Sequence, residues 1–265
     1  MPREVTAFSN STVKLLRSLR DKKARRAEGL FLAEGLRILT EARDSGRLPE
    51  IVAFSAEGAK HPLAAEIIAA TEAAGGDAVE TTPDILAKMS GKDNPQMLLG
   101  AYRQPPTSLD RIDRAKAPLW IVAQALRDPG NIGTILRTGD AVGAGGLILV
   151  DDCADPFSVE AVRASMGALF TQEIATARWE EFVPWLRSGE GQLVGTSLKA
   201  SDDYLEAQYK RPCFLLIGNE QQGLPPDYEA QCDLLVKIPM AGRADSLNAA
   251  IAAAVMAFAI RASWR

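Results

Sequence analysis

The chain has 265 residues, of which 47% are hydrophobic and 24% are charged, and its formal net charge is −4. These values are ordinary for a globular protein with one large or two modest domains. No apolar run reaches the roughly 18 residues that a membrane-spanning helix needs, and the polar start of the chain shows no apolar signal segment. The sequence therefore predicts a cytoplasmic protein that does not bind membranes.

Cysteine and histidine are too sparse for most metal or hydrolase sites. Cys153, Cys213 and Cys232 are far apart, a spacing that suits neither a disulfide framework nor a zinc site. We expect them to be small buried side chains. The single histidine, His61, precedes Pro62 in a polar stretch with no serine motif near it, so a Ser-His-Asp relay is disfavoured and no metal is predicted.

The first hundred residues have the pattern of a small α/β domain. Ser9-Asn10-Ser11 can cap a helix that runs through Val13 and Leu16. Short apolar runs predict strands, and helical periodicity predicts the helices between them; the strands are 30–33, 51–54, 78–80 and 97–102, and the helices are 34–43, 63–74 and 83–89.

Basic residues are concentrated near the start of the chain, which the negative net charge conceals. Between Lys14 and Arg26 the only acidic residue is Asp21. By itself such a cluster also fits a solvated helix face, so contact with RNA phosphates is one of two interpretations. The basic residues are Lys14, Arg17, Arg20, Lys22, Lys23, Arg25 and Arg26.

A change in composition and in apolar periodicity separates two predicted domains. Residues 104–118 carry Pro105, Pro106 and Pro118 among polar residues, with little apolar periodicity, and are the best linker candidate. We therefore predict a first domain over 1–103, a linker over 104–118 and a second domain over 119–265.

The second domain alternates strands, glycine turns and helices. The expected strands are 119–124, 147–150, 192–196, 214–217 and 234–238, and an Ala-rich helix from Ser246 to Ala262 ends the chain. This alternation predicts a parallel sheet with helices on both faces.

Three motifs follow strands of this sheet. The first, Asp128-Pro129-Gly130-Asn131-Ile132-Gly133, opens a helix that carries Arg137, and the free N–H groups there attract polar ligands. The second runs from Ile217-Gly218-Asn219-Glu220 to Leu224, at a strand end where parallel sheets bind ligands. An ordinary turn and a solvated polar loop remain structural alternatives for these two.

The third motif joins Ile238-Pro239-Met240-Ala241-Gly242 to Asp245-Ser246-Leu247-Asn248. We expect Ser246 or Asp245 to cap the last helix. Asn248 is a poor helix former inside the expected first turn, so capping by its neighbours leaves it unexplained. None of the three motifs is a dinucleotide or P-loop fingerprint, which disfavours phosphate cradling.

Together and in this order, the three motifs resemble those of the SpoU (TrmH-like) family of RNA 2′-O-ribose methyltransferases in the SPOUT superfamily. The stretches 155–167, 14–26 and 31–37 are also similar to that family, so the resemblance covers nearly the whole chain and is weakest from Phe54 to Tyr102. Departures, such as Gln221-Gln222 where glycine is frequent, are small. The resemblance implies an α/β protein whose C-terminal parallel-sheet domain contains a trefoil knot, preceded by a small α/β RNA-binding domain.

The resemblance also implies an activity, a cofactor and a set of site residues. The activity is methylation of a ribose 2′-hydroxyl in structured RNA by S-adenosylmethionine, and the separate first domain favours ribosomal over transfer RNA. The implied cofactor contacts are Gly218, Asn219, Ile238, Met240 and Leu247, and the implied catalytic residues are Asn131, Arg137, Glu220, Ser246 and Asn248. The implied RNA contacts are Lys14, Arg17, Lys22, Lys23, Arg25, Arg26 and Arg163.

Family members are homodimers in which the arginine often crosses the interface, and the Ala-rich last helix is compatible with such close packing. Guanidinium is a poor base, so we expect Arg137 to hold an RNA phosphate and stabilise the developing alkoxide. Two alternatives stay open: the same chemistry on transfer RNA, and a non-catalytic RNA-binding ribosome assembly factor. The intact Arg137, Glu220 and Asn248 argue against the second, because a pure binder needs none of them.

Overall fold

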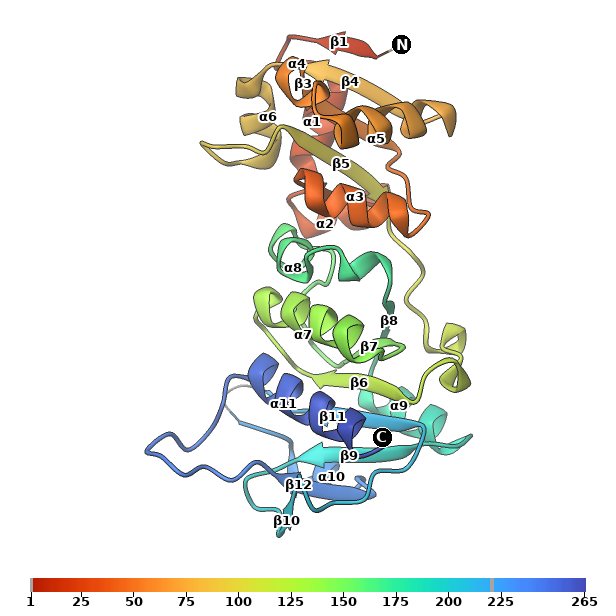
Figure 1. Ribbon diagram of the computed structural model, residues 1–265, viewed down its shortest axis with the longest axis vertical. Coiled ribbons are helices and arrows are strands. Elements are labelled where there is room, and N and C mark those ends of the chain that lie inside the picture. Colours follow the sequence, from red (N-terminus) through yellow and green to blue (C-terminus); the bar gives the residue numbers. More distant parts are fainter. Residues whose placement is uncertain (1, 220–221) are drawn as a thin grey trace. The chain divides into compact units, whose positions relative to one another are not determined.

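The computed structural model describes residues 2–219 and 222–265, which form two compact units (Figure 1). Unit 1 comprises the described residues up to Pro105 together with Asp155–Thr171, and unit 2 comprises Pro106–Ala154 and the described part of Gln172–Arg265. The segment Asp155–Thr171 thus packs with the N-terminal residues, whereas the sequence pattern had grouped it with the second domain. Periodicity carries no signal for such contacts between distant segments.

Unit 1 is built on a five-stranded sheet in the order β1-β4-β3-β5-β2. Strands β1, β3 and β4 run parallel, and β5 is antiparallel to both β2 and β3. The α/β character expected for the N-terminal part is confirmed, although the three-residue β1 is too short for a sequence pattern to reveal. The strands are β1 (Arg3–Val5), β2 (Leu30–Glu34), β3 (Ile51–Ser55), β4 (Asp77–Thr81) and β5 (Leu98–Arg103).

The helices of unit 1 follow the sequence signals closely. The Asn10 side chain caps α1, where its Oδ1 accepts from the Thr12 N–H at 2.8 Å, and this confirms the expected start of that helix. The helices are α1 (Ser11–Ser18), α2 (Lys22–Glu28), α3 (Leu36–Asp44), α4 (Ala56–Ala59), α5 (Pro62–Ala73), α6 (Pro83–Ser90) and α8 (Val159–Ser165), with a 3-10 turn at Ala168–Phe170.

Aromatic packing explains why Asp155–Thr171 belongs to unit 1. The ring of Phe31 on β2 lies 5.3 Å from that of Phe157, measured between centroids, and the ring of Tyr102 on β5 lies 4.8 Å from that of Phe170. Burial of such rings is a large apolar contribution to stability. The segment is therefore held by the core of unit 1.

Unit 2 is built on a seven-stranded sheet in the order β10-β12-β9-β11-β6-β7-β8, and every neighbouring pair is parallel. The predicted parallel α/β sheet is confirmed. Two strands were not expected, β8 because its sequence mixes polar and apolar residues and β10 because it has two residues. The strands are β6 (Leu119–Gln124), β7 (Gly146–Val150), β8 (Glu173–Ala177), β9 (Gln192–Thr196), β10 (Asp202–Asp203), β11 (Cys213–Ile217) and β12 (Leu234–Lys237).

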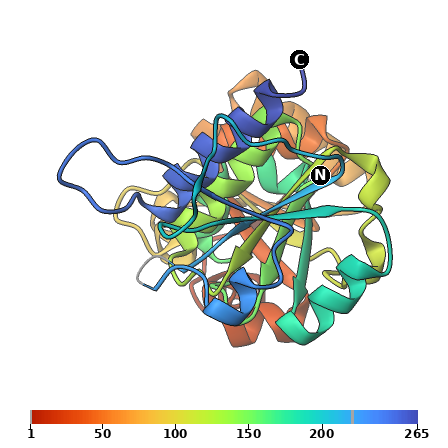
Figure 2. The ribbon, with the colours of Figure 1, turned by 90° about the horizontal axis from the view of Figure 1, so that it is seen from below.

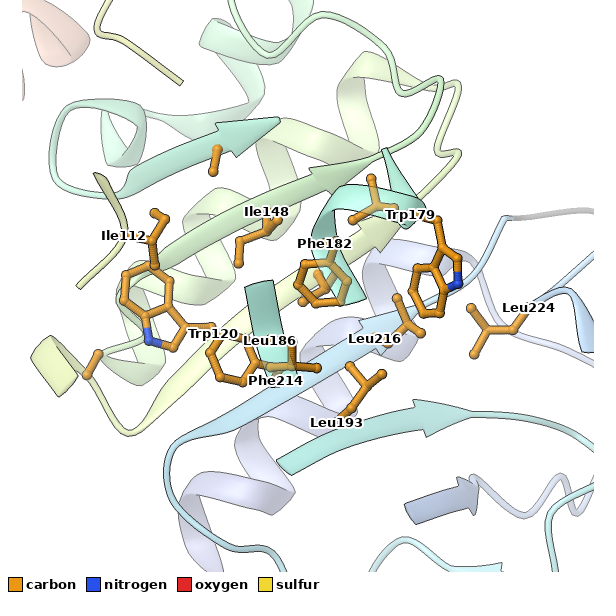
Figure 3. Packing of buried hydrophobic residues seen from close by; sticks show 14 residues of the cluster. Ile112, Trp120, Ile148, Trp179, Phe182, Leu186, Leu193, Phe214, Leu216 and Leu224 are labelled. Carbon is orange, nitrogen blue, oxygen red and sulfur yellow. The ribbon is translucent and has the colours of Figure 1, made fainter. Parts of the chain in front are cut away.

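Helices cover both faces of this sheet, as Figure 2 shows. On one face, Phe182 and Leu186 of α9 pack with Trp120, Phe214 and other buried side chains (Figure 3). The other face is covered by α7 and α11, which contact each other. Helix α7 also contacts β6 and β7, and helix α11 contacts β6 and β11. The helices are α7 (Pro129–Val142), α9 (Trp179–Arg187), α10 (Pro226–Glu229) and α11 (Ala249–Ala262), with 3-10 turns at Leu109–Arg111 and Arg114–Lys116.

The described helices are all too short or too polar to span a bilayer. The segment between β12 and α11, dark blue in Figures 1 and 2, projects away from the sheet. All of its residues from Ala241 to Asn248 are exposed. It connects the strand and helix that carry the third motif.

Candidate cofactor and RNA site

A cavity lies in unit 2 at the carboxyl ends of β9, β11 and β12. It has a volume of about 310 Å³ and is partly open to solvent, which is within the range of pockets that hold small ligands. The second and third motif loops form most of its wall. The cavity is lined by Gly218, Asn219, Ile238, Met240 and Leu247, which are the five residues expected to contact the cofactor, and also by Ser246.

Gly218 allows the second motif loop to fold back on itself. A Cβ atom at this position would lie 2.5 Å from the carbonyl carbon of Gly223 and 2.6 Å from the nitrogen of Leu224. The same turn is closed by a hydrogen bond from the Gly223 N–H to the Asn219 carbonyl, at 3.0 Å. Backbone meets backbone here, so only glycine fits without a shift.

The Asn219 side chain ties this loop to the turn between β6 and α7. Its Nδ2 donates to the Ala125 carbonyl at 2.8 Å, and Ala125 has a φ of 50°, an uncommon backbone conformation for a residue with a side chain. The side chain of Asn219 therefore stabilises the contact between two motif loops. Glu220, expected near the ribose, and Gln221 lie outside the described residues.

The first and third motifs are joined by two asparagines. Asp128 caps α7, because its Oδ1 accepts from the Gly130 N–H at 2.6 Å. This orients the first turn of α7, where Asn131 is buried and its Oδ1 accepts from Asn248 Nδ2 at 3.0 Å. The structure thus brings together two of the expected catalytic residues from positions 117 apart in the chain.

Asn248 caps the last helix, and our expectation about that cap was wrong. The helix begins at Ala249, and Asn248 Oδ1 accepts from the N–H groups of Ala250 and Ile251 at 2.9 and 3.2 Å. Ser246, which with Asp245 was one of two alternative expected caps, donates its hydroxyl to the Asp245 carboxylate instead. Capping therefore explains an asparagine at position 248 without any catalytic role.

Arg137 stands apart from the cavity. It is exposed on α7 and does not line the cavity wall. Within residues 2–219 and 222–265 it forms no hydrogen bond or ion pair through its guanidinium. The guanidinium is thus available to a ligand or a second chain.

Three charged residues of the cavity wall were not expected from the sequence. Glu229 of α10, Lys237 of β12 and Lys199 after β9 all line the cavity. Single charged residues in short elements carry no motif, so the sequence offered no signal for them. Only the folded chain shows that they share one cavity.

Most of the expected RNA contacts of unit 1 are exposed. Lys14 and Arg17 on α1 and Lys22, Lys23 and Arg26 on α2 are all exposed. Arg163 on α8 is exposed as well. Within the described part of the chain these residues form no ion pair, and exposed positive charge suits contact with a phosphate backbone.

Arg25 is the exception, and its expected role in RNA binding is corrected. The residue is 3% exposed, and its Nη2 forms an ion pair with Asp155 Oδ2 at 2.6 Å. Its Nη1 donates to the carbonyls of Leu19 and Arg20 at 2.9 and 2.8 Å. A guanidinium bound in this way holds Asp155–Thr171 to α2 and has no free face for a phosphate.

Cys153, Cys213 and His61 lie in surroundings that suit a structural role. Burial raises the pKa of the Cys153 thiol to about 11 and that of Cys213 to about 12, so neither is a thiolate at neutral pH. His61 is exposed and caps α5, its Nδ1 accepting from the Leu63 N–H.

The fold and the cavity define a class of protein whose chain combines a parallel α/β domain, with a cavity at its strand ends, and an α/β unit that exposes basic helices. Within that class, residues 118–258 match the family model described as the SpoU rRNA Methylase family. Residues 10–100 match an MRM3-like substrate binding domain. The chain belongs to the SpoU rRNA methylase family, which confirms the resemblance of its three motifs.

Relatives of known activity span nearly the whole chain. A 23S rRNA (uridine(2479)-2′-O)-methyltransferase from Streptomyces viridochromogenes is 32% identical, over 90% of this chain and 84% of its own. A 23S rRNA (guanosine(2553)-2′-O)-methyltransferase from Bacillus subtilis is 28% identical, over 98% and 99%. The crystal structure of an AdoMet-bound rRNA methyltransferase from Sinorhizobium meliloti is 40% identical, with a TM-score of 0.90 over 98% and 97% of the two chains.

Proposed function

We propose that this protein methylates a ribose 2′-hydroxyl of ribosomal RNA with S-adenosylmethionine as the methyl donor. The observation that carries the proposal is the convergence of the second and third family motifs on one cavity. The relatives that match both units act on 23S rRNA by their names. A tRNA-modifying relative matches 56% of this chain, so the presence of unit 1 favours ribosomal RNA.

The cavity wall suits the donor. Ile238, Met240 and Leu247 offer apolar surface to the adenine, while the backbone at Gly218 and Asn219 offers N–H and C=O partners. When bound, S-adenosylmethionine supplies an activated methyl group on its sulfonium. The residues of this chain bind it, exclude water and fix its orientation.

Arg137 is proposed to act on the RNA. A guanidinium stays protonated at neutral pH, so it is a poor base. Its charge can hold the phosphate beside the target ribose and stabilise the alkoxide that develops as the hydroxyl proton leaves. Asn131, Asn248, Ser246 and Glu220 complete the proposed catalytic set, in which the Asn131–Asn248 hydrogen bond orients the two loops.

A homodimer is part of the proposal. Ile251 and Phe258 lie on α11 with 51% and 55% of their surface exposed, which leaves an apolar helix face for a second copy. Arg137 lies outside the cavity of its own chain, which supports its supply to the partner's site. Light scattering should give about twice the 28.4 kDa chain mass, and Phe258→Asp should give a monomer without methyl transfer.

Three further parts of the proposal rest on the family. The last segment of the chain would pass through a loop to form the trefoil knot, and the packing of α11 against α7, β6 and β11 is compatible with this. The exposed basic residues of unit 1 would bind RNA phosphates. The enzyme would work in the cytoplasm, where it meets its RNA.

Alkaline hydrolysis of RNA tests the function directly. A 2′-O-methyl group prevents the 2′-oxygen from attacking the adjacent phosphodiester, so the modified position resists cleavage. RNA from cells with the protein should contain one protected position in ribosomal RNA that is cleaved in cells without it. Protection that appears only in transfer RNA, or no difference between the cells, contradicts the proposal.

A further inference from the structure

Two oppositely charged residues of the cavity wall form no ion pair among the described residues. Glu229 and Lys237 both line the cavity, and both are only partly exposed. Neither forms an ion pair with the other or with any other residue in the described ranges 2–219 and 222–265. The two groups thus share one cavity and remain unpaired.

Partial burial of an unpaired charge is unfavourable. Removing a carboxylate or ammonium from water costs free energy unless an opposite charge or a hydrogen bond compensates for it. Some other charges of unit 2 do find partners, as Lys116 does with Glu173 and Arg187 with Asp233. A ligand that carries both a cation and an anion would compensate both groups at once.

The element that carries Glu229 is held firmly. The hydroxyl of the preceding residue, Tyr228, donates to Asp151 Oδ2 at 3.0 Å. The Tyr228 ring stacks on that of Trp179, with 3.8 Å between centroids and 5° between planes. Asp151 Oδ1 in turn accepts from the Trp179 N–H at 3.0 Å. The short helix α10 is therefore fixed on Asp151, which follows β7, and on Trp179 of α9, and the backbone of Glu229 is fixed with it.

Lys237 is held by the sheet itself. It ends β12, between β9 and β10. Its carbonyl accepts from the Tyr204 N–H at 3.1 Å. Both charges are thus carried by backbone whose position is set before any ligand binds, which reduces the entropic cost of binding.

We infer that Glu229 and Lys237 form an amino-acid subsite, in which Glu229 binds the α-ammonium and Lys237 the α-carboxylate of the cofactor's methionine moiety. This inference rests on the proposed function, because it places the methyl donor in this cavity. The apolar residues Ile238 and Leu247, which also line the cavity, would then receive the adenosine part. Lys199 and Asp245 also line the cavity but are exposed, so solvent screens them and they contribute less.

Truncated ligands separate the two ends of the cofactor. S-adenosylhomocysteine carries both charges on a neutral thioether, its decarboxylated form keeps only the ammonium, and 5′-methylthioadenosine has neither. Calorimetry of these ligands with the full-length protein measures affinity without any turnover. The variants are Glu229→Gln and Lys237→Met, with Lys210→Met, an exposed lysine outside the cavity, as the matched control.

Each variant should lose affinity only for ligands that carry its partner group. Both should bind S-adenosylhomocysteine about tenfold more weakly, which corresponds to about 1.4 kcal/mol, and should bind 5′-methylthioadenosine as the wild type does. Lys237→Met should bind the decarboxylated ligand normally, whereas Glu229→Gln should not. Lys210→Met should change none of the three affinities.

Several outcomes overturn the inference. An equal loss for S-adenosylhomocysteine and 5′-methylthioadenosine would indicate general damage to the cavity, and unchanged affinities would show that the charges are not used. A loss for Lys199→Met without one for Lys237→Met would assign the carboxylate to the exposed lysine. If the wild-type protein binds none of the ligands, the proposed function fails, and the subsite with it.

Discussion

The two units differ in whether a buried or partly buried charge has a partner within the described residues. In unit 1 the guanidinium of Arg25 is almost completely buried and is bound by Asp155 and two backbone carbonyls. In unit 2 Glu229 and Lys237 are partly buried, line a cavity and have no partner among the described residues. The two places thus differ in burial and in pairing, because the deeply buried charge of unit 1 is compensated within the chain and the partly buried charges of unit 2 are not.

The difference distinguishes charges that hold the fold from charges that bind a ligand. A paired buried charge stabilises the native packing, and its removal leaves the partner uncompensated. An unpaired, partly buried charge at a cavity does not stabilise the native packing, and it gains its partner on binding. The predictions below test this division, beginning with the largest expected effect.

Arg25→Ala should destabilise unit 1. Asp155 would remain as a mostly buried carboxylate without its counter-charge, and breaking such a pair costs about 3–5 kcal/mol. Urea unfolding followed by far-UV circular dichroism, a signal that does not depend on tryptophan, measures the loss in the free energy of unfolding. Arg26→Ala is the matched control, because Arg26 is the exposed neighbour on the same helix and should change stability by less than about 0.5 kcal/mol. Equal stability of the two variants would contradict the structural role of Arg25.

Arg137→Ala should impair chemistry and leave the fold intact. Loss of a charged contact that forms in the transition state costs about 3–4 kcal/mol, or 10²–10³ in rate, whereas an exposed and unpaired guanidinium contributes little to stability. Single-turnover methyl transfer measures the rate, and calorimetry with S-adenosylhomocysteine should give the wild-type affinity. Arg137→Lys, which keeps the charge but not the planar fork, should recover part of the rate. A rate within threefold of the wild type for Arg137→Ala would remove Arg137 from the site.

Gly218→Ala should reduce cofactor affinity. The added methyl group would lie 2.5 Å from a backbone atom of Gly223, so the loop must shift, and overpacking of this kind costs about 1–3 kcal/mol. This corresponds to roughly 5- to 150-fold weaker binding of S-adenosylhomocysteine. Gly242→Ala is the control, because no atom lies within 4 Å of a Cβ built there. Similar affinities for the two variants would show that this loop does not contact the cofactor.

The sequence patterns predicted the main helices and strands and the loops that form the cavity, because strands, caps and motifs depend on residues close together in the chain. The parallel sheet and the α1 cap at Asn10 followed from periodicity and from side-chain chemistry. All five expected cofactor contacts line the cavity for the same reason, since they lie in the loops that follow β11 and β12. Their role toward the cofactor itself stays a prediction.

Local patterns failed where the outcome depends on tertiary contacts. Arg25 is indistinguishable in sequence from Arg26, and only the packing of Asp155 against α2 makes it structural. Asn248 looked unexplained because the last helix was expected to begin at Ser246, and a shift of three residues makes it the cap. Glu229 and Lys237 had no motif at all, because the feature that marks them is the absence of a partner in the folded chain.

Tyr228→Phe is the mildest test of the comparison, because it changes how a ligand-binding charge is held and not the charge itself. Burial and the hydrogen bond to Asp151 raise the pKa of Tyr228 above its ordinary value, so at neutral pH its hydroxyl is protonated and donates. The variant loses this hydrogen bond, worth about 0.5–1.5 kcal/mol, while the ring can still stack on Trp179.

If Tyr228 acts by positioning Glu229, Tyr228→Phe should weaken binding of S-adenosylhomocysteine about threefold and leave 5′-methylthioadenosine unaffected. The same substitution in a Glu229→Gln background should then have no further effect on affinity, because the group that it positions is already uncharged. Such non-additivity in a double-mutant cycle is expected only for residues that act through each other. Additive losses, or a loss for 5′-methylthioadenosine, would mean that Tyr228 supports the cavity in general, and that the stack and hydrogen bond around Asp151 belong with Arg25 among the contacts that hold the fold.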